Sequence, residues 1–504
     1  MGSVELVISD MNFENWCKLD EAIYISLTEE TFRQYAGFNY NESVLKRLTS
    51  MIMRNAEIFV ELFSEPRILY LSELETIAEA KTKSLELKLH KIRTKKIISD
   101  SKFTFNDSPV TWNTWRQFNC IEKDPLARRS VFDDFIEKTS FIAPVIEKRF
   151  SIIKKVYSTL SEKQHGLDSI DRNKNFGPLS GYLESEGMTL SKLKKFVTKM
   201  GKQARNPFFG AITLASEIIG RQPEYYDDFY FFRNRIFKEV EKPFKKIDPV
   251  TSVKKTLKSM GFDIASIKFD TENRNRKYPS PICFFITIPS DIRVLYKSES
   301  PYFDFQGCYH ETGHAVHAAS INKNMSYADK YKFPMGIAEI FSIFLERLTR
   351  NPLYLKSVLG ICDEKVLSQL IQRNRFMELF FVTFYAANSL MKLEYWTKNL
   401  TIEETNDLYE DLVRRFTGFE MPGRYWMLHH ILPESIMYVP SYLFAAVRAA
   451  ELEKYLRDKF GDKWWVDYRA SRKLKEIMSS GARIDLNQFS KLDLNIFMKE
   501  IVDN

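Results

Sequence analysis

Cysteine is scarce in this chain, which argues against a fold held together by disulfides or by zinc–thiolate clusters. Five cysteines are spread singly through 504 residues, namely Cys17, Cys120, Cys283, Cys308 and Cys362. An odd, dispersed set of thiols is typical of proteins in a reducing compartment. We therefore expect a cytoplasmic protein with free thiols.

Long apolar segments are also lacking. The longest apolar stretches, such as residues 379–387, are far shorter than the roughly 20 residues of a membrane helix. The N-terminal residues contain no basic segment followed by a long apolar run, which a signal peptide requires. Leu6 stands where a myristoylation signal needs Ser or Thr. The sequence thus predicts neither export nor membrane attachment.

Glycine and proline are infrequent, at 18 residues each, which favours short loops and a mostly helical architecture. The net charge of +8 is mild, and basic residues are scattered among acidic ones. Even the densest basic cluster, residues 91–96, is more typical of a solvated helix face than of a nucleic-acid site. A nucleic-acid-binding role therefore ranks last among the hypotheses.

Helical patterning dominates the first half of the chain, and a strand-like segment marks the second. Amphipathic helices are predicted over residues 42–63, 71–96, 124–160, 190–200 and 223–240. The Gly- and Asn-rich residues 165–183 predict a linker. Residues 283–289 and 292–297 are β-branched or aromatic runs separated by a turn, and they predict a β-hairpin. Helices are expected from there to the C-terminus, the last of them beginning at residue 441.

The sequence HETGH at residues 310–314 has the spacing of a zinc-binding helix. Residues four apart lie on one helix face, so His310 and His314 can bind one Zn²⁺ through ring nitrogens. Glu311 would lie beside the metal, where it can act as general base toward a zinc-bound water. Gly313 would let another segment approach the helix closely. The alternative is a pair of ordinary surface or core histidines, since so short a motif also occurs by chance.

A catalytic zinc site needs a third protein ligand. In the next predicted helix, residues 334–348, Glu339 and Glu346 lie seven residues apart and opposite an aliphatic stripe. Their face is either merely solvated, or it borders a cleft in which Glu339 binds the metal and Glu346 orients a histidine. His317 shares the face of the HETGH histidines. Because one helix rarely supplies three ligands, an orienting or packing role is favoured over a rival ligand.

The segment HETGHAVH, with Glu339 twenty-five residues after the second histidine and Glu346 seven residues later, resembles the thimet oligopeptidase and oligoendopeptidase F family of zinc metallopeptidases. The hairpin before the motif and the downstream blocks RNRFMELFF and LTIEETNDLYEDLVRRFTG are similar to segments of that family. The similarity covers about residues 280–450. It implies that His310, His314 and Glu339 bind one Zn²⁺ per chain, with Glu346 as partner of a ligand histidine.

The resemblance also implies tyrosine donors for the transition state. Tyr438 and Tyr442 have the four-residue spacing of the family's pair, and their hydroxyls would stabilise the oxyanion. The family's histidine is missing at the expected offsets, and prolines and a glutamate replace its glycine-rich loop. His429 and His430 are candidates to replace that histidine.

The motif and the resemblance together predict a zinc-dependent peptidase acting on short, unstructured oligopeptides. The implied fold is mainly α and two-lobed, with a deep substrate channel and a small β-hairpin or sheet beside the zinc helix. Residues 1–205 would form a helical lid or channel wall, and residues 206–504 the catalytic lobe. Substrate would add to the hairpin edge as an extra strand.

Two other functions stay open. A metallocarboxypeptidase of related helical fold would need a basic side chain for the substrate C-terminus, such as Arg424 or Arg448. A catalytically silent peptide-binding protein is suggested by the departures from the family around Tyr438. Nothing in the sequence indicates the cleavage preference, the physiological substrate or the oligomeric state.

Overall fold

The structure is a computed structural model. It describes residues 11–63, 65–95, 103–105, 107–111, 114–163, 177–227, 240–274, 276–278, 280–297, 301–429, 431–433 and 435–503.

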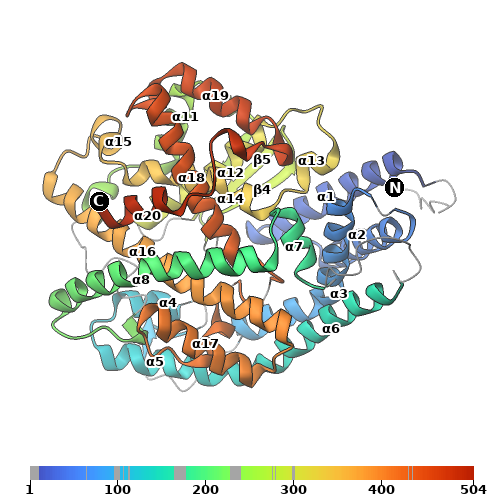
Figure 1. The fold of residues 1–504 in the computed structure, drawn as a ribbon, viewed down its shortest axis with the longest axis horizontal. Helices are drawn as coiled ribbons and strands as arrows, with labels where there is room; N and C mark the ends of the chain where they lie inside the picture. Colours follow the sequence, from blue (N-terminus) through green and yellow to red (C-terminus); the bar gives the residue numbers. More distant parts are fainter. Residues whose placement is uncertain are drawn as a thin grey trace.

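Helices dominate this described part of the chain (Figure 1). Those of the first half are α1 (Phe13–Tyr35), α2 (Glu42–Leu62), α3 (Arg67–Lys95), α4 (Trp115–Ile121), α5 (Pro125–Lys138), α6 (Ala143–Lys163), α7 (Ser180–Ser185) and α8 (Leu190–Ile219). Those of the second half are α10 (Glu241–Phe244), α11 (Pro249–Ser259), α12 (Pro301–Ser320), α13 (Tyr327–Tyr331), α14 (Met335–Glu346), α15 (Pro352–Ser357), α16 (Glu364–Lys398), α17 (Ile402–Thr417), α18 (Val439–Phe460), α19 (Tyr468–Met478) and α20 (Leu494–Asp503).

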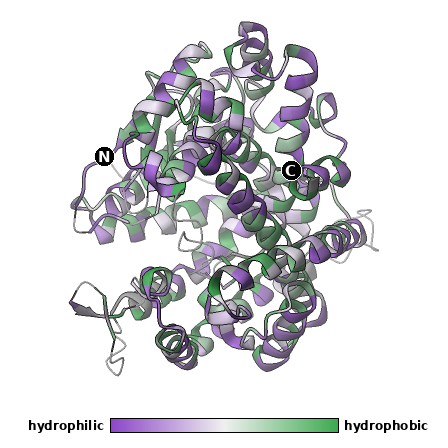
Figure 2. Cartoon of the chain, turned by 90° about the vertical axis from the view of Figure 1, so that its left-hand side faces the viewer, coloured by the Kyte–Doolittle hydropathy of each residue, from purple (hydrophilic) through white to green (hydrophobic). Residues whose placement is uncertain are grey.

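Side-chain caps explain where several of these helices begin. Asn41 accepts from the backbone amides of α2, and Thr189 does the same for α8. Thr401 and Glu404 form a reciprocal capping box at the start of α17. Most helices in Figure 2 carry hydrophilic and hydrophobic residues along one ribbon, as amphipathic helices on a shared core do.

A small sheet lies beside α12 (Figure 1). Its strands are β3 (Ile267–Asp270), β4 (Ile282–Thr287) and β5 (Asp291–Leu295), in the order β3-β5-β4. β4 and β5 are antiparallel, which confirms the predicted hairpin, whereas β3 runs parallel to β5. A separate pair, β1 (Thr104–Phe105) and β2 (Ser108–Pro109), is antiparallel. β4 is therefore an edge strand of the three-stranded sheet.

The N-terminal helix covers one face of this sheet, and α12 covers the other. Phe32 and Ala36 of α1 join a cluster with Phe284 and Ile286 of β4, and the Phe32 and Phe284 rings lie 5.4 Å apart. On the opposite side, α12 contacts both β4 and β5. Residues from distant parts of the sequence thus hold the hairpin in place next to the HETGH segment.

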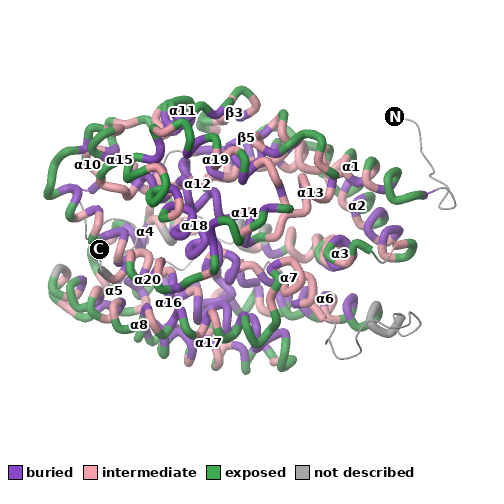
Figure 3. The backbone as a smooth tube through the Cα atoms, turned by 45° about the horizontal axis from the view of Figure 1, so that its top comes forward, coloured by how far each residue is buried: buried purple, intermediate pink, exposed green. Residues whose placement is uncertain are grey.

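The centre of the molecule is formed by α12, α14, α16 and α18, whose residues are mostly buried (Figure 3). A buried charge cluster ties the N-terminal helices to this centre. Lys332, which follows α13, lies 2.9 Å from Glu73 of α3 and 3.4 Å from Asp20 of α1. Both carboxylates are fully buried, and the Tyr327 hydroxyl also donates to Asp20 at 2.6 Å. The first helices are therefore integral to the fold beside α14.

The predicted helices are found at residues 42–62 and 67–95, and the prediction for 190–200 marks the start of the longer α8. The predicted helix 223–240 and linker 165–183 fall largely outside the described residues. The predicted boundary between residues 205 and 206 lies inside α8, and the division into lobes stays a prediction. Among the described residues, no helix combines the length and the apolar character needed to cross a bilayer.

Candidate metal centre

The HETGH helix and the next long helix touch backbone to backbone. A Cβ atom at Gly313 of α12 would lie 2.2 Å from the Phe341 carbonyl oxygen and 2.6 Å from the Ser342 Cα of α14. No residue other than glycine fits this crossing without moving a helix. The expected role of Gly313 as a point of close approach is thus confirmed. It brings His310 and His314 on α12 against Glu339 on α14.

Three potential ligand atoms converge at this crossing. The Nε2 atoms of His310 and His314 lie 3.3 Å and 3.5 Å from Oε2 of Glu339. All three ligand atoms lie within 4.8 Å of one another. Glu339 is almost fully buried, while the two imidazole side chains keep 19% and 13% of their surface exposed. The cluster is therefore open to solvent on its histidine side.

The residues present fit a zinc ion. Two imidazole nitrogens and a carboxylate oxygen form a common donor set of catalytic zinc sites, and ligands about 2.0–2.1 Å from a tetrahedral zinc lie about 3.3 Å apart. A buried carboxylate also requires nearby positive charge. Burial raises the pKa of Glu339, but His314 and His310 outweigh it and hold this pKa well below the usual range. An ionised carboxylate facing two imidazoles is a suitable cation site.

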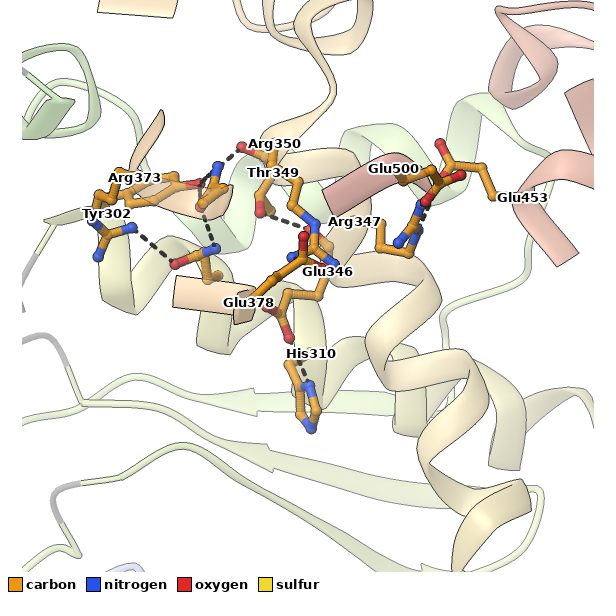
Figure 4. Close-up of polar contacts among 12 residues, drawn as sticks. Tyr302, His310, Glu346, Arg347, Thr349, Arg350, Arg373, Glu378, Glu453 and Glu500 are labelled. Atoms are coloured by element: carbon orange, nitrogen blue, oxygen red, sulfur yellow. Dashed lines mark hydrogen bonds and ion pairs between the residues drawn. The ribbon is translucent and has the colours of Figure 1, made fainter. Parts of the chain in front are cut away.

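Glu346 lies about two turns beyond Glu339 on the same face of α14 and binds the other side of the His310 ring. Its Oε2 lies 2.9 Å from Nδ1 of His310 (Figure 4). In the neutral imidazole, an Nδ1–H bond to this carboxylate leaves Nε2 unprotonated and directed at the cluster, as in carboxylate–histidine–metal arrangements. Burial lowers the pKa of His310, but hydrogen bonds to Glu339 and Glu346 raise it well above its ordinary value. Metal binding must therefore displace a proton, so metal affinity falls as the pH falls.

Two hydroxyl groups fix the Glu339 carboxylate. Ser342 donates to Oε2 at 2.8 Å, and Tyr438 donates to Oε1 at 2.5 Å. Burial and the neighbouring Glu339 raise the pKa of Tyr438 well above its usual value, so its hydroxyl stays protonated. Tyr438 thus contacts the predicted metal ligand. The sequence-based expectation had given it only a contact to the transition state. Ser342 was missed, although its three-residue spacing from Glu339 is a usable signal.

Glu311 lies between the histidines and the edge of the sheet. Burial raises the pKa of its carboxyl, and His310 and His314 offset part of this increase. A backbone hydrogen bond from Cys283 on β4 reaches the same carboxylate. Glu311 is therefore held next to both the candidate metal cluster and the edge strand.

Tyr442 is the second predicted tyrosine, and its ring lies 5.1 Å from that of Tyr438. Burial raises the pKa of Tyr442 well above its usual value. Tyr385 of α16 is 5.7 Å from Tyr442 and 5.9 Å from the His429 ring, so His429 lies behind an intervening aromatic side chain. The Nδ1 atom of His429 accepts from the Ile431 amide at 3.2 Å. His430, the other candidate histidine, lies outside the described residues.

Two buried donors of α16 hold the loop that leads to Tyr438, and no sequence pattern indicates them. Lys392 of α16 donates to the carbonyl oxygens of Leu432 and Ser435 at 2.8 Å and 2.9 Å. The Trp396 indole donates to the Ile436 carbonyl at 2.8 Å. Burial lowers the pKa of Lys392 well below its ordinary value. These bonds fix the backbone just before the tyrosine pair.

Comparisons with known proteins agree with this geometry. Residues 266–481 match the profile of peptidase family M3, whereas no curated protein matches the chain significantly. The crystal structure of BsuCP is 15% identical, with a TM-score of 0.59 over 97% of this chain and 98% of that chain. A crystal structure of a proposed oligoendopeptidase F from Bacillus anthracis str. Ames is 14% identical, with a TM-score of 0.55 over 97% of this chain and 84% of that one.

Such low identities show a shared fold, and the expectation of a mainly α fold with a small sheet beside α12 is confirmed. The matched segment contains the sheet, both helices of the candidate centre and the tyrosine pair. Residues 266–481 are thus similar to peptidase family M3.

Proposed function

We propose that this protein is a zinc-dependent peptidase that hydrolyses short oligopeptides, with His310, His314 and Glu339 as the metal ligands. The observation that carries the proposal is the convergence of two imidazole Nε2 atoms on one buried carboxylate oxygen, at 3.3 Å and 3.5 Å. The match of residues 266–481 to a peptidase family supports peptide hydrolysis as the reaction.

The side chains around the cluster have distinct tasks in this reaction. A zinc ion held there would supply Lewis acidity, which polarises a carbonyl and makes water more acidic. Glu311 accepts a proton from the attacking water and passes it to the leaving amine, and its raised pKa makes it a stronger base than an exposed glutamate. Tyr442 stays protonated and can donate to the oxyanion. Tyr438 orients Glu339 and reaches the oxyanion only after releasing that carboxylate.

The substrate is proposed to bind as an extra strand on β4. This strand has β5 on one side, and its other side is the edge of the sheet. The backbone of Cys283 in this strand bonds to Glu311, so the edge and the general base are neighbours. Short, unstructured peptides suit such a site because their backbone is free to extend. We further propose action in the cytoplasm, where the chain's free cysteines would stay reduced.

A carboxypeptidase would need a free basic side chain for the terminal carboxylate of its substrate. Arg448 is a poor candidate because it is buried and pairs with Glu186 at 3.2 Å. Arg424 is exposed and remains the candidate for that alternative.

The test is a digest of a defined peptide library by the wild type and by Glu311→Gln, with products identified by mass spectrometry. Glu403→Gln, a change at an exposed glutamate of α17, is the matched control. We expect internal cleavage by the wild type and the control. Glu311→Gln should be at least about 100-fold slower while it retains zinc, since it has lost the general base.

Each other outcome has a clear meaning. Stepwise removal of C-terminal residues would favour the carboxypeptidase alternative. Binding of zinc and peptide by the wild type without hydrolysis would favour the silent peptide-binding protein. Equal hydrolysis by the wild type and Glu311→Gln would contradict the proposal.

A further inference from the structure

The helix that carries Glu339 begins without a capping side chain of its own. Its N-cap residue is Pro334, which makes no side-chain cap bond, and the first amides of a helix have no partner within the helix. Glu186, which follows α7, supplies the missing acceptor: the Gly336 amide donates to its Oε1 at 2.6 Å. A carboxylate there also meets the positive end of the helix dipole.

Gly336 leaves the space that this carboxylate occupies. A Cβ atom at residue 336 would lie 2.4 Å and 2.6 Å from the two oxygens of Glu186, and 2.8 Å from its Cδ. Any other residue at this position would displace the carboxylate or the helix. Glu186 therefore packs closely against Gly336, which lies three residues before Glu339 in α14.

The same carboxylate joins α14 to the helix of the tyrosine pair. Its Oε2 lies 3.2 Å from Nη1 of Arg448 on α18, and Glu186 and Arg448 are only 7% and 6% exposed. About two helical turns earlier in α18, Ser441 donates to the Tyr182 hydroxyl of α7 at 3.0 Å. Because α18 carries Tyr442 and follows Tyr438 directly, Glu186 connects the two helices that border the cluster.

The C-terminal end of α14 is held by a cation, the guanidinium group of Arg347. Arg347 pairs with Glu453 of α18 at 2.6 Å and with Glu500 of α20 at 2.5 Å (Figure 4). An anion at the N-terminus and a cation at the C-terminus both match the helix dipole. The axial position of α14, and with it that of Glu339, is therefore set from both ends.

We propose that Glu186 is a positioning residue of the metal centre: by capping α14 and pairing with Arg448, it sets where Glu339 meets His310 and His314. The inference rests on the proposed zinc function. It gives a residue within the first 205 an indirect task in metal binding, through the position of Glu339, in addition to any covering role.

The test measures the zinc dissociation constant of the full chain by competition with a chromophoric chelator. Three variants disturb the contact differently: Glu186→Gln removes the charge, Gly336→Ala fills the space, and Glu186→Gln with Arg448→Met removes both charges. The double variant keeps the test decisive if Glu186→Gln fails to fold with an unpaired buried Arg448. Glu184→Gln is the control. The Glu184 side chain is 38% exposed, and its ion pair with Arg67 is long, at 3.6 Å.

We expect zinc binding about tenfold weaker in all three variants, comparable to the loss of a residue that orients a ligand, and unchanged within about twofold in the control. Folded variants that bind zinc as tightly as the wild type, even with a lower melting temperature in the zinc-free state, would overturn the positioning role alone. A wild type that binds no zinc would overturn both this role and the proposed function.

Discussion

His317 lies one helical turn beyond His314 but is packed away from the three ligand atoms. Its ring packs at a tilt against the rings of Phe341 and Phe333, at centroid distances of 4.5 Å and 5.3 Å, and its Nε2 has no hydrogen-bond partner. Burial, helped by His314, lowers its pKa to about 3. Of the two roles favoured at the outset, orienting and packing, these contacts support packing.

The burial of His317 should make the folded protein less stable in acid. The pKa of His317 falls from about 6.5 in the unfolded chain to about 3 in the folded one, so folding excludes a proton between these values. The contribution of His317 to the free energy of unfolding is therefore most favourable above pH 6.5. As the pH falls toward 3, this contribution is lost at up to about 1.4 kcal/mol per pH unit. Urea unfolding of metal-free wild type and His317→Phe should therefore diverge below pH 6.5, with the wild type more acid-sensitive. Parallel pH profiles would contradict this.

The site residues that belong to a sequence motif could be predicted, whereas those outside any motif could not. His310, His314, Glu339 and Glu346 were selected by spacing, and their side chains lie together. Glu186 is 153 residues away from Glu339 in the sequence and lies in no recognisable pattern, so only the folded chain reveals their connection. Roles in catalysis stay predictions for all of them.

The pair α12 and α14 is the element that creates the candidate centre. Their contact requires Gly313, since its position is filled by backbone atoms of α14 that cannot move aside as a side chain would. Ligand geometry and helix packing are therefore coupled at one residue.

Gly313→Ala should consequently lower both stability and zinc affinity. The added methyl overlaps the Phe341 carbonyl, and overpacking of this kind costs about 1–3 kcal/mol or more. Gly210→Ala is the control: nothing lies within 4 Å of its Cβ position in α8, so it should stabilise by about 0.5–1 kcal/mol. Urea unfolding and chelator competition on both variants measure the two effects. A Gly313→Ala protein with wild-type stability and zinc affinity would refute the coupling.

Elements with strong periodicity were predictable, and those defined by distant contacts were not. The helix at residues 42–62 and the β4–β5 hairpin follow from their own hydrophobic patterns. The short strand β3 was missed because its four residues are held by pairing with β5, not by local propensity. The long helix predicted from residue 441 is found as α18, which begins at Val439, but it is not the last one, since α19 and α20 follow it.

For the whole molecule, the main departure from simple expectation concerns the N-terminal helices. A mobile lid would make few buried polar contacts with the helices of the candidate centre, yet Lys332 forms ion pairs with the buried Asp20 and Glu73, and Glu186 caps α14. Breaking such pairs leaves uncompensated buried charges and costs several kcal/mol. These contacts attach α1, α3 and the residue after α7 to the part of the molecule that holds the candidate centre, and the division into lobes stays a prediction.

The fold class followed from composition and motif resemblance, because few glycines and prolines and strong helical patterning restrict the architecture. The packing of the helices could not be predicted, because it depends on individual buried hydrogen bonds and ion pairs between residues far apart in the sequence. Lys392 under the tyrosine loop is one example, and Arg347 between α18 and α20 is another.

Metal analysis of the purified full chain by mass spectrometry tests the central claim most directly. The comparison includes the wild type, His314→Ala and Glu339→Gln, with Glu403→Gln as an exposed control. The geometry at α12 and α14 predicts one zinc per chain in the wild type and the control, and a large loss in the two ligand variants. A wild type without zinc, or ligand variants that retain a full equivalent, would contradict the assignment of this site as the metal centre.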